Sequence, residues 1–507
     1  MAGLIAAALA GCAALTGTHA GDVKVTGATP IAPPPAWEAP NSRGPYRGLP
    51  VSVPFCRVEA VIEGNIGFEL WLPANWNGRL LGAGVGGDAG VYNYIDMSQR
   101  VAEGFATVTT DSGHKASQAR WMADPKARVD YEHRAVHLTT GAAKRLAAAF
   151  YGRAVDRSYF TGCSGGGRQA LKEMQNYPGD YDGVIAGAPG PYMPLQSVRM
   201  MWFSLQQKQM PDAGLTDADW SLYEAKATAA CDAADGVVDG IIANPMACRF
   251  RVETLLCKPG QTGRCLTAPR LAMLKTIVSP MRDEQGRAMD GGLLPGVRTR
   301  PGPPSPLLRA MWADGVYNDP NWNEDGFRPT ADLDAANRAM PELRADKLAI
   351  APFIKAGGKA ILYQGWADPS TNAGPTIDYF AALARAHGGA ARLGEAVRLF
   401  MVPGMYHCRG GPGPDAFGAS GQPTWPNDPG RDMLWALIRW VERGQAPQQI
   451  TAAKRIDGKD VLTRKLCPYP QAARYQGKGA AADAGSYRCT VDPDLEKAMA
   501  RRSLVGS

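Results

Sequence analysis

One serine in this chain is surrounded by residues that lack a side chain. Residues 162–166 read Gly-Cys-Ser-Gly-Gly, which matches the pattern G-x-S-x-G centred on Ser164. Residues 157–162 are typical of a buried strand, and residues 167–178 are typical of a helix that ends near Pro178. A sharp turn from strand to helix exposes the serine Oγ at the edge of a sheet, and the glycines let the neighbouring backbone pass. The pattern therefore predicts that Ser164 is a nucleophile.

A nucleophilic serine needs a base, and in this class of turn the chain order is serine, then a carboxylate, then histidine. Of the six histidines, only His387 and His407 follow Ser164. His387 ends a predicted helix, where a histidine favours the helix dipole without any role in catalysis. His407 follows a predicted strand and lies in a glycine-rich loop. We therefore expect His407 to be the base.

The carboxylate that orients the histidine is expected at the end of a strand between Ser164 and His407. Residues 357–368 form a predicted strand that ends in Asp368. Asp378, inside the next predicted helix, is the weaker candidate.

A cysteine stands beside each of the two central residues. Cys163 precedes Ser164 directly, and Cys408 follows His407 directly. If Ser164 and His407 meet, the two sulfurs also come near bonding distance. A disulfide there would hold nucleophile and base within the narrow tolerance that catalysis requires.

Negative charge that develops on an attacked carbonyl needs hydrogen-bond donors. The backbone N–H of Gly165, directly after the nucleophile, is one expected donor. The second is expected from the glycine-rich loop 82–90, where Gly86 and Gly87 are the candidates.

The elements that must position these residues alternate along the chain. Strand and helix patterns alternate through residues 79–190 and again through residues 357–444, which predicts a mostly parallel sheet covered on both faces. The segment from about residue 191 to 346 lacks this alternation and is interpreted as an insertion. The formal charge of +7 is small for 507 residues and has no basic cluster, so no nucleic-acid partner is expected.

The first residues resemble a secretory leader. The apolar run within residues 1–20 is shorter than the roughly 20 residues that a membrane span needs, so no transmembrane segment is expected. Thr18–Ala20 suits cleavage of a signal peptide, which predicts a secreted or periplasmic protein. Leu9–Cys12 also looks like a lipobox, in which Cys12 would carry the lipid of an outer-membrane lipoprotein. Both possibilities stay open at this point.

Cysteine usage agrees with export, because ten cysteines without a CxxC zinc pattern are typical of disulfide-bonded proteins. Three pairs would close short loops, although sequence does not establish connectivity. They are Cys231 with Cys248, Cys257 with Cys265, and Cys467 with Cys489.

Together these features resemble the tannase and feruloyl esterase family, which includes mono(2-hydroxyethyl) terephthalate hydrolases. The resemblance rests on "GCSGGGR" around Ser164, "GWAD" ending in Asp368, and "HC" at His407 and Cys408. It implies an α/β-hydrolase fold with an inserted lid. The expected divisions are a leader over 1–20, a first core part over 21–190, a lid with a calcium site over 191–345, and a second core part over 346–507. By the same resemblance Cys56 lacks its expected partner near Met97 and is expected to be a free thiol.

A second site is predicted in the insertion. Asp232, Asp235 and Asp239 lie in one glycine-punctuated loop, and converging oxygen ligands suit Ca²⁺. The family resemblance implies the same three aspartates together with the backbone carbonyls of Val237 and Ile241. The role of this calcium would be structural.

The function expected from these observations is hydrolysis of esters of aromatic acids through an acyl-enzyme, with feruloyl, galloyl and terephthaloyl monoesters left unresolved. Two alternatives stay open. One is an esterase or acyl transferase for a different acyl group. The other is a calcium-stabilised binding protein that keeps the fold without turnover.

Overall fold

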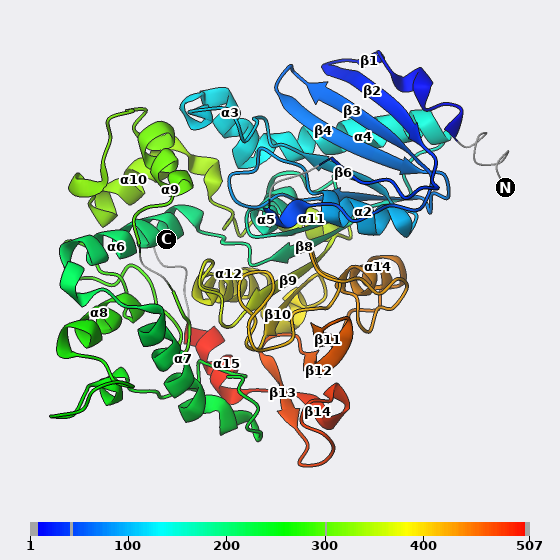
Figure 1. Ribbon diagram of the computed structural model, residues 1–507. Coiled ribbons are helices and arrows are strands. Elements are labelled where there is room, and N and C mark those ends of the chain that lie inside the picture. Colours follow the sequence, from blue (N-terminus) through cyan, green and yellow to red (C-terminus); the bar gives the residue numbers. More distant parts are fainter. Residues whose placement is uncertain (1–8, 41–43, 300–301, 502–507) are drawn as a thin grey trace.

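One large sheet organises the computed structural model, which describes residues 9–40, 44–299 and 302–501 (Figure 1). Within that part of the chain, ten strands pair in the order β1-β2-β3-β4-β6-β5-β7-β8-β9-β10. They are β1 (His19–Ala20), β2 (Val23–Ile31), β3 (Phe55–Ile62), β4 (Ile66–Pro73), β5 (Arg79–Ala83), β6 (Ala106–Thr110), β7 (Arg157–Cys163), β8 (Gly183–Gly187), β9 (Lys359–Gly365) and β10 (Val397–Val402). Two hairpins lie outside this sheet, β11 (Ile450–Ile456) with β12 (Lys459–Leu466) and β13 (Gln471–Tyr475) with β14 (Tyr487–Val491).

The sheet has an antiparallel part and a parallel part. Strands β1 to β4 and β6 pair antiparallel with their neighbours in that order, whereas β6, β5, β7, β8, β9 and β10 run parallel. The parallel part is the one predicted from the alternation of strands and helices. The antiparallel part was not predicted, because its strands follow one another without the intervening helices that signal parallel pairing.

Helices cover both faces of the parallel part. Consecutive residues of a strand point to opposite faces. Phe160 packs with residues of α5 (Gly165–Asn176) and α12 (Ala373–Ala386), whereas Tyr159 packs with residues of α14 (Met433–Arg443). Both faces are therefore buried, as parallel sheets require. The helices are α2 (Tyr94–Ala102), α3 (Pro125–Val129), α4 (Ala135–Tyr151), α5 (Gly165–Asn176), α6 (Met193–Gln209), α7 (Asp217–Cys231), α8 (Ala268–Val278), α9 (Pro306–Ala310), α10 (Pro329–Ala339), α11 (Ala351–Lys355), α12 (Ala373–Ala386), α13 (Ala390–Leu393), α14 (Met433–Arg443) and α15 (Pro493–Arg501).

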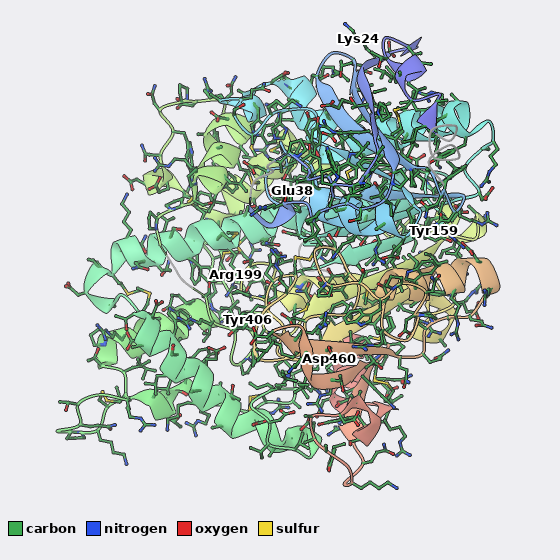
Figure 2. The ribbon with its side chains drawn as sticks, turned by 45° about the vertical axis from the view of Figure 1, so that its right-hand side comes forward. Lys24, Glu38, Tyr159, Arg199, Tyr406 and Asp460 are labelled. Carbon is green, nitrogen blue, oxygen red and sulfur yellow. A yellow bond between two sulfur atoms is a disulfide. The ribbon has the colours of Figure 1, made fainter. Side chains whose placement is uncertain are left out.

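Helices α6 to α10 lie between β8 and β9 in the chain and gather on one side of the molecule, opposite β1 to β4 (Figure 1). Trp220, Tyr223 and Ile277 form part of a separate hydrophobic cluster in this segment. Figure 2 places Tyr406 close to these helices, and its hydroxyl donates to Glu224 Oε1 of α7 at 2.7 Å. The loop that carries His407 is thus tied to the inserted segment.

Five disulfides account for all ten cysteines. They are Cys12–Cys56, Cys163–Cys408, Cys231–Cys248, Cys257–Cys265 and Cys467–Cys489. The prediction of a free thiol at Cys56 is wrong, because Cys12 lies close enough to bond it. Disulfides of this number are typical of proteins that fold in an oxidising compartment.

The segment predicted to be a leader packs against the sheet in this structure. Leu9, Cys12 and Leu15 are buried in a cluster with side chains of β2, β3 and β4. A Cys12 sulfur bonded to Cys56 does not carry a lipid, and cleavage after Ala20 would remove Cys12 altogether. Among the helices of the described ranges, we find none that is long and apolar enough to cross a membrane.

Candidate active site

Ser164 stands at the turn between β7 and α5, in a strained backbone conformation. Its φ of 61° and ψ of −126° lie in a region that residues with side chains rarely adopt. The glycines around it are sterically required, because a Cβ on Gly162 would lie 2.5 Å from the Gly166 carbonyl, and one on Gly167 would lie 2.1 Å from Gly187 O. The local sequence thus forces the serine outward at the carboxyl end of the strand.

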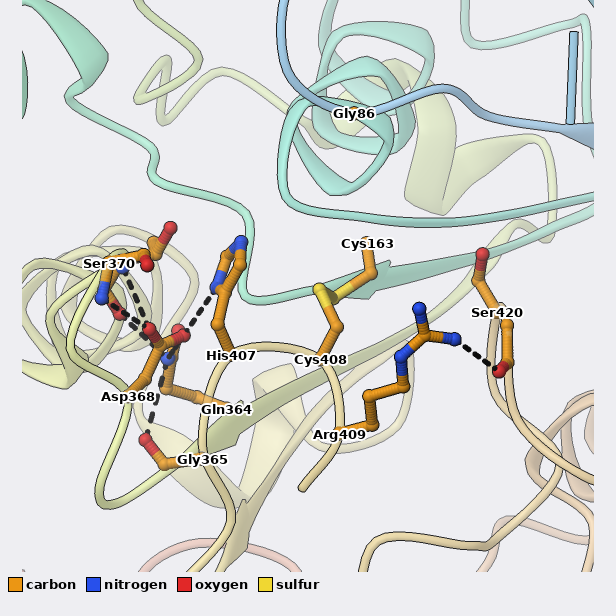
Figure 3. The surroundings of a disulfide bond; sticks show 12 residues. Gly86, Cys163, Gln364, Gly365, Asp368, Ser370, His407, Cys408, Arg409 and Ser420 are labelled. Atoms are coloured by element: carbon orange, nitrogen blue, oxygen red, sulfur yellow. Dashed lines mark hydrogen bonds and ion pairs between the residues drawn. A yellow bond between two sulfur atoms is a disulfide. The ribbon is translucent and has the colours of Figure 1, made fainter. Parts of the chain in front are cut away.

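His407 and Asp368 meet beside this turn. The distance between His407 Nδ1 and Asp368 Oδ2 is 2.8 Å, and the Asp368 side chain is fully buried (Figure 3). The other oxygen, Oδ1, accepts the backbone N–H groups of Ser370 and Thr371 at 2.8 Å each. Gln364 Nε2 donates to Asp368 Oδ2 at 3.0 Å. The carboxylate is therefore fixed in place, and it fixes the imidazole in turn.

The rival candidates from the sequence lie elsewhere. Asp378, on α12, lines a different cavity from that of Ser164. His387 Nε2 is bonded to Leu348 O at 2.8 Å, at the end of α12. Of the candidates considered, the structure brings Asp368 and His407 together with Ser164 and leaves the other two outside.

The surroundings of His407 raise the pKa of its imidazole. Burial lowers the pKa of His407, but the charge of Asp368 and its hydrogen bond outweigh burial, so the pKa is raised overall. A raised pKa strengthens the imidazole as a proton acceptor from Ser164. Because Nδ1 is engaged by Asp368, Nε2 is the nitrogen left for the serine.

The Cys163–Cys408 disulfide joins the two halves of the site. It links the residue before Ser164 to the residue after His407, across 245 positions of sequence (Figure 3). Ser164 and His407 line the same two cavities. The covalent link therefore lies beside Ser164 and His407, and both cysteines line one of the two cavities.

The first of these cavities has a volume of about 170 Å³ and lies under the inserted helices. Its lining is mainly apolar and includes five methionines, Met122, Met193, Met200, Met311 and Met340. Thioether sulfurs make favourable contacts with aromatic rings. This methionine-lined cavity was not foreseen, since scattered methionines carry no sequence pattern.

The second cavity has a volume of about 430 Å³ and shares Ser164, Gly87 and His407 with the first. Tyr46, Asp88, Arg409 and Ser420 are among its lining residues. Two spaces lined by different residues therefore meet at Ser164.

The three backbone N–H groups predicted as oxyanion donors, those of Gly165, Gly86 and Gly87, have different surroundings in the structure. Gly165 is the first residue of α5, so its N–H has no acceptor within the helix. In this structure the Gly86 N–H donates to the Tyr46 hydroxyl at 2.6 Å. Gly87 lies close to the turn, since a Cβ on Gly165 would be 3.2 Å from Gly87 N. Sequence reasoning missed Tyr46, which lies far from the turn along the chain and belongs to no motif.

Residues 231–248, hereafter the acidic loop, contain the predicted calcium ligands. Their carboxylates bond backbone N–H groups of the same loop: Asp232 with Asp239 and Gly240, Asp235 with Val237, and Asp239 with Ile241. Asp239 also forms an ion pair with Arg464. In the part of the chain that is described, no three side chains of metal-binding type are arranged to hold a metal ion.

The donor chemistry of the acidic loop nevertheless suits a hard cation. Burial raises the pKa of Asp235 and of Asp239, and repulsion from the other carboxylates raises both further. Arg464 lowers them without cancelling these effects. The loop therefore concentrates negative charge and oxygen donors, although its carboxylates point to backbone groups in this structure.

Comparison with known proteins finds esterases by family profile, by sequence and by structure. The profile of the family described as "Tannase and feruloyl esterase" matches residues 51–312 and 315–490. An uncharacterized esterase of Xanthomonas campestris pv. campestris is 33% identical over 99% of this chain and 95% of its own. Feruloyl esterase C of Talaromyces stipitatus is 33% identical over 86% of each chain. The crystal structure of feruloyl esterase B from Aspergillus oryzae superposes with a TM-score of 0.88 at 28% identity, covering 95% of this chain and 100% of that one.

Proposed function

The chain belongs to the tannase and feruloyl esterase family and is a carboxylic ester hydrolase of α/β-hydrolase fold, and we propose that it cleaves esters of aromatic acids with Ser164 as nucleophile. The observation that carries the proposal is the arrangement of Ser164 on its strained turn beside the His407–Asp368 pair, linked by Cys163–Cys408.

The mechanism follows from which atoms are free. His407 Nε2 takes the proton from Ser164 Oγ as the oxygen attacks the ester carbonyl, and Asp368 stabilises the imidazolium that forms. The Gly165 N–H donates to the developing oxyanion. His407 then gives the proton to the departing alcohol, which leaves the acyl group on Ser164. A water molecule, deprotonated by His407, releases the acid.

The two cavities suggest how the substrate lies. The methionine-lined cavity is apolar and suits the aromatic ring of the acyl group, because sulfur and ring edges attract one another. The second cavity, whose lining includes the charged side chains of Asp88 and Arg409, is proposed to take the alcohol part. The acyl group is proposed to be of the feruloyl, galloyl or terephthaloyl monoester type.

We further propose that the acidic loop binds a structural Ca²⁺. Asp232, Asp235 and Asp239, with the carbonyls of Val237 and Ile241, would hold it, and an oxygen-only donor set is the kind that Ca²⁺ takes. The ion would neutralise the repulsion among these carboxylates. It takes no part in the proposed ester chemistry.

Export is proposed from the disulfides and the apolar start of the chain. Five disulfides form and persist in oxidising compartments. The retained Cys12–Cys56 bond requires that any leader be removed before Cys12. N-terminal sequencing of the exported protein tests where the chain is cleaved, and a mature chain that begins after Cys12 would contradict the retained Cys12–Cys56 bond.

A substrate panel tests the proposed function. Purified protein is offered methyl ferulate, methyl gallate and mono(2-hydroxyethyl) terephthalate beside methyl hexanoate, an aliphatic ester. We expect kcat/KM for at least one aromatic ester to exceed that for methyl hexanoate by about tenfold or more, because the ring gains contacts in the apolar cavity. Equal or better hydrolysis of the aliphatic ester would reject the aromatic specificity, and acyl transfer to an added alcohol in preference to water would identify a transferase.

A further inference from the structure

Two charged side chains line the second cavity, and neither has an ionic partner among the residues that the structure describes. They are Asp88, in the loop after β5, and Arg409, in the loop after β10. Within the same part of the chain, the Arg409 side chain makes one hydrogen bond, from Nη1 to Gly421 O at 3.1 Å (Figure 3). A guanidinium has five N–H groups, and a carboxylate can accept several hydrogen bonds. Both side chains are therefore available to a ligand.

The chain holds these two charges next to the reacting groups. Asp88 follows Gly87 directly, and Arg409 lies two residues beyond His407. Gly87, His407 and Ser164 line both cavities, whereas Asp88 and Arg409 line only the second of the two. The part of an ester that occupies the second cavity therefore meets both charges while its carbonyl lies at Ser164.

The opposite signs of the two charges limit what kind of alcohol the cavity accepts. An apolar alcohol would remove water from both groups without returning a hydrogen bond, which costs free energy. An anionic alcohol would be attracted by Arg409 but repelled by Asp88, and a cationic alcohol the reverse. A neutral alcohol with several hydroxyls satisfies both groups, because each hydroxyl can donate to the carboxylate and accept from the guanidinium.

The rest of the lining agrees with a neutral, polar occupant. Tyr46 and Ser420 add uncharged hydroxyls to the wall. Asp96 lies behind that wall, where its buried carboxylate already accepts the Ser420 hydroxyl at 2.6 Å and the Gly421 N–H at 2.7 Å. It does not line the cavity. The volume of about 430 Å³ is also far larger than a methyl group fills.

We propose that Asp88 and Arg409 select the alcohol part of the ester, and that the alcohol they favour is neutral and carries several hydroxyl groups. The inference rests on the proposed function, in which the second cavity takes the alcohol part. Asp88 accepts hydrogen bonds from the hydroxyls, and Arg409 donates hydrogen bonds to them. Neither exchanges a proton with the substrate, so the two residues determine specificity and leave the chemistry to Ser164 and His407.

Four esters of one acid test this proposal, and the acid is the aromatic acid with the highest kcat/KM in the substrate panel. The alcohols are glycerol, which is neutral with two further hydroxyls, methanol, which has none, choline, which is cationic, and glycolate, which is anionic. We expect kcat/KM for the glyceryl ester to exceed that for each other ester by about tenfold, because its hydroxyls bind charged groups. A methyl ester cleaved as well as the glyceryl ester, or a charged ester cleaved better, would overturn the proposal.

Two variants should shift the preference in opposite directions. The quantity measured is kcat/KM for the glycolate ester divided by kcat/KM for the choline ester, so a general loss of activity cancels. Asp88→Asn leaves the positive charge of the pair and should raise this ratio by about tenfold, whereas Arg409→Gln leaves the negative charge and should lower it by a similar factor. The matched controls are Asp457→Asn and Arg443→Gln, at exposed positions outside both cavities, which should keep the wild-type ratio. An unchanged ratio in either cavity variant would overturn the proposal.

The same four alcohols are also esterified to hexanoic acid, which separates the alcohol part from the acyl part. If the aromatic esters are not cleaved but the hexanoic esters show the expected ratios, the aromatic specificity fails and the role of Asp88 and Arg409 stands. If the aromatic esters are cleaved with ratios that neither variant changes, the proposed function stands and the role of the two residues is overturned. No cleavage of any ester would reject both.

Discussion

The Cys163–Cys408 disulfide joins residues 245 positions apart, whereas Cys231–Cys248 closes a separation of 17 residues in the acidic loop. Beside the first, backbone N–H groups of Ser370 and Thr371 hold the Asp368 carboxylate, and this carboxylate binds the His407 imidazole. At the second, the carboxylates bind backbone N–H groups of their own loop, and Asp239 also pairs with Arg464 of β12, but none of them binds a histidine. The long-range disulfide therefore fixes the position of two reacting groups, while the local one stabilises a loop. Variants at the two places should accordingly affect different quantities, turnover at the first and stability at the second.

The largest effect is expected at the nucleophile. Ser164→Ala should lower kcat by about 10⁴-fold or more, because no other group replaces the attacking oxygen. The melting temperature should stay near that of the wild type, because Ala keeps the Cβ and the backbone conformation of Ser164 and removes only the hydroxyl. Ser158→Ala, at the other end of the same strand, is the control and should keep its activity. A Ser164→Ala enzyme with wild-type kcat would show that Ser164 is not the nucleophile.

The next effect concerns the partner of His407. Asp368→Asn should lower kcat by on the order of 10³- to 10⁴-fold, because the imidazolium loses its stabilising charge. It should also lower the pKa of His407, since Asp368 is what raises it. The base must be neutral, so activity falls as pH drops through this pKa, and the acid limb of kcat/KM should move to lower pH in the variant.

Asp378→Asn is the matched control for that experiment, because it was the rival carboxylate and lies outside the site of Ser164. Its pH profile should match the wild type. If the acid limb stays in place in Asp368→Asn, or if it moves in Asp378→Asn, Asp368 is not the carboxylate that orients His407.

A smaller effect on turnover is expected from the long-range disulfide. Replacing Cys163 and Cys408 together with Ala should lower kcat by on the order of 10²-fold, because a displacement of about 1 Å at reacting groups has this cost. The melting temperature should change proportionately less. The control is the double replacement of Cys257 and Cys265, a remote pair eight positions apart. Unaltered kcat in the first variant, or free thiols at both positions in the active wild type, would limit this disulfide to a structural role.

The smallest effect on turnover belongs to the acidic loop. Chelation with EGTA should lower the melting temperature by roughly 2–5 °C, since an ion at one hundred times its Kd stabilises by about 2.7 kcal/mol. At saturating substrate, kcat should stay the same. Asp232→Asn should abolish the response of the melting temperature to EGTA. Asp212→Asn, at an exposed position of the inserted segment outside the acidic loop, should retain that response. A melting temperature insensitive to EGTA, with no calcium in elemental analysis, would reject the site.

The parts of the site that could be predicted are those encoded by local pattern. The glycines around Ser164 and the flanking strand and helix reveal the turn, and the small number of histidines isolates His407. The parts that could not be predicted depend on contacts between distant segments. Tyr46 reaches Gly86 from an irregular turn, and no spacing relates the two.

The start of the chain illustrates a second limit. An apolar run rich in small residues is typical of a leader and also of a segment that packs on a sheet, and in this structure Leu9, Cys12 and Leu15 are buried and Cys12 bonds Cys56. The antiparallel strands β1 to β4 were missed for a related reason, because prediction relied on strands that alternate with helices. By contrast, β7 (Arg157–Cys163) and β9 (Lys359–Gly365) lie at the predicted strands 157–162 and 357–368.

Covalent labelling of Ser164 tests the central claim most directly. The protein is treated with an aryl fluorophosphonate, which traps a serine nucleophile as a tetrahedral adduct, and the labelled peptide is mapped by mass spectrometry while residual esterase activity is measured. The account predicts one adduct per chain, on Ser164, with activity lost in proportion to labelling, and much slower labelling in His407→Ala. Full esterase activity after complete labelling of Ser164, or loss of activity with the adduct on another residue, would contradict it.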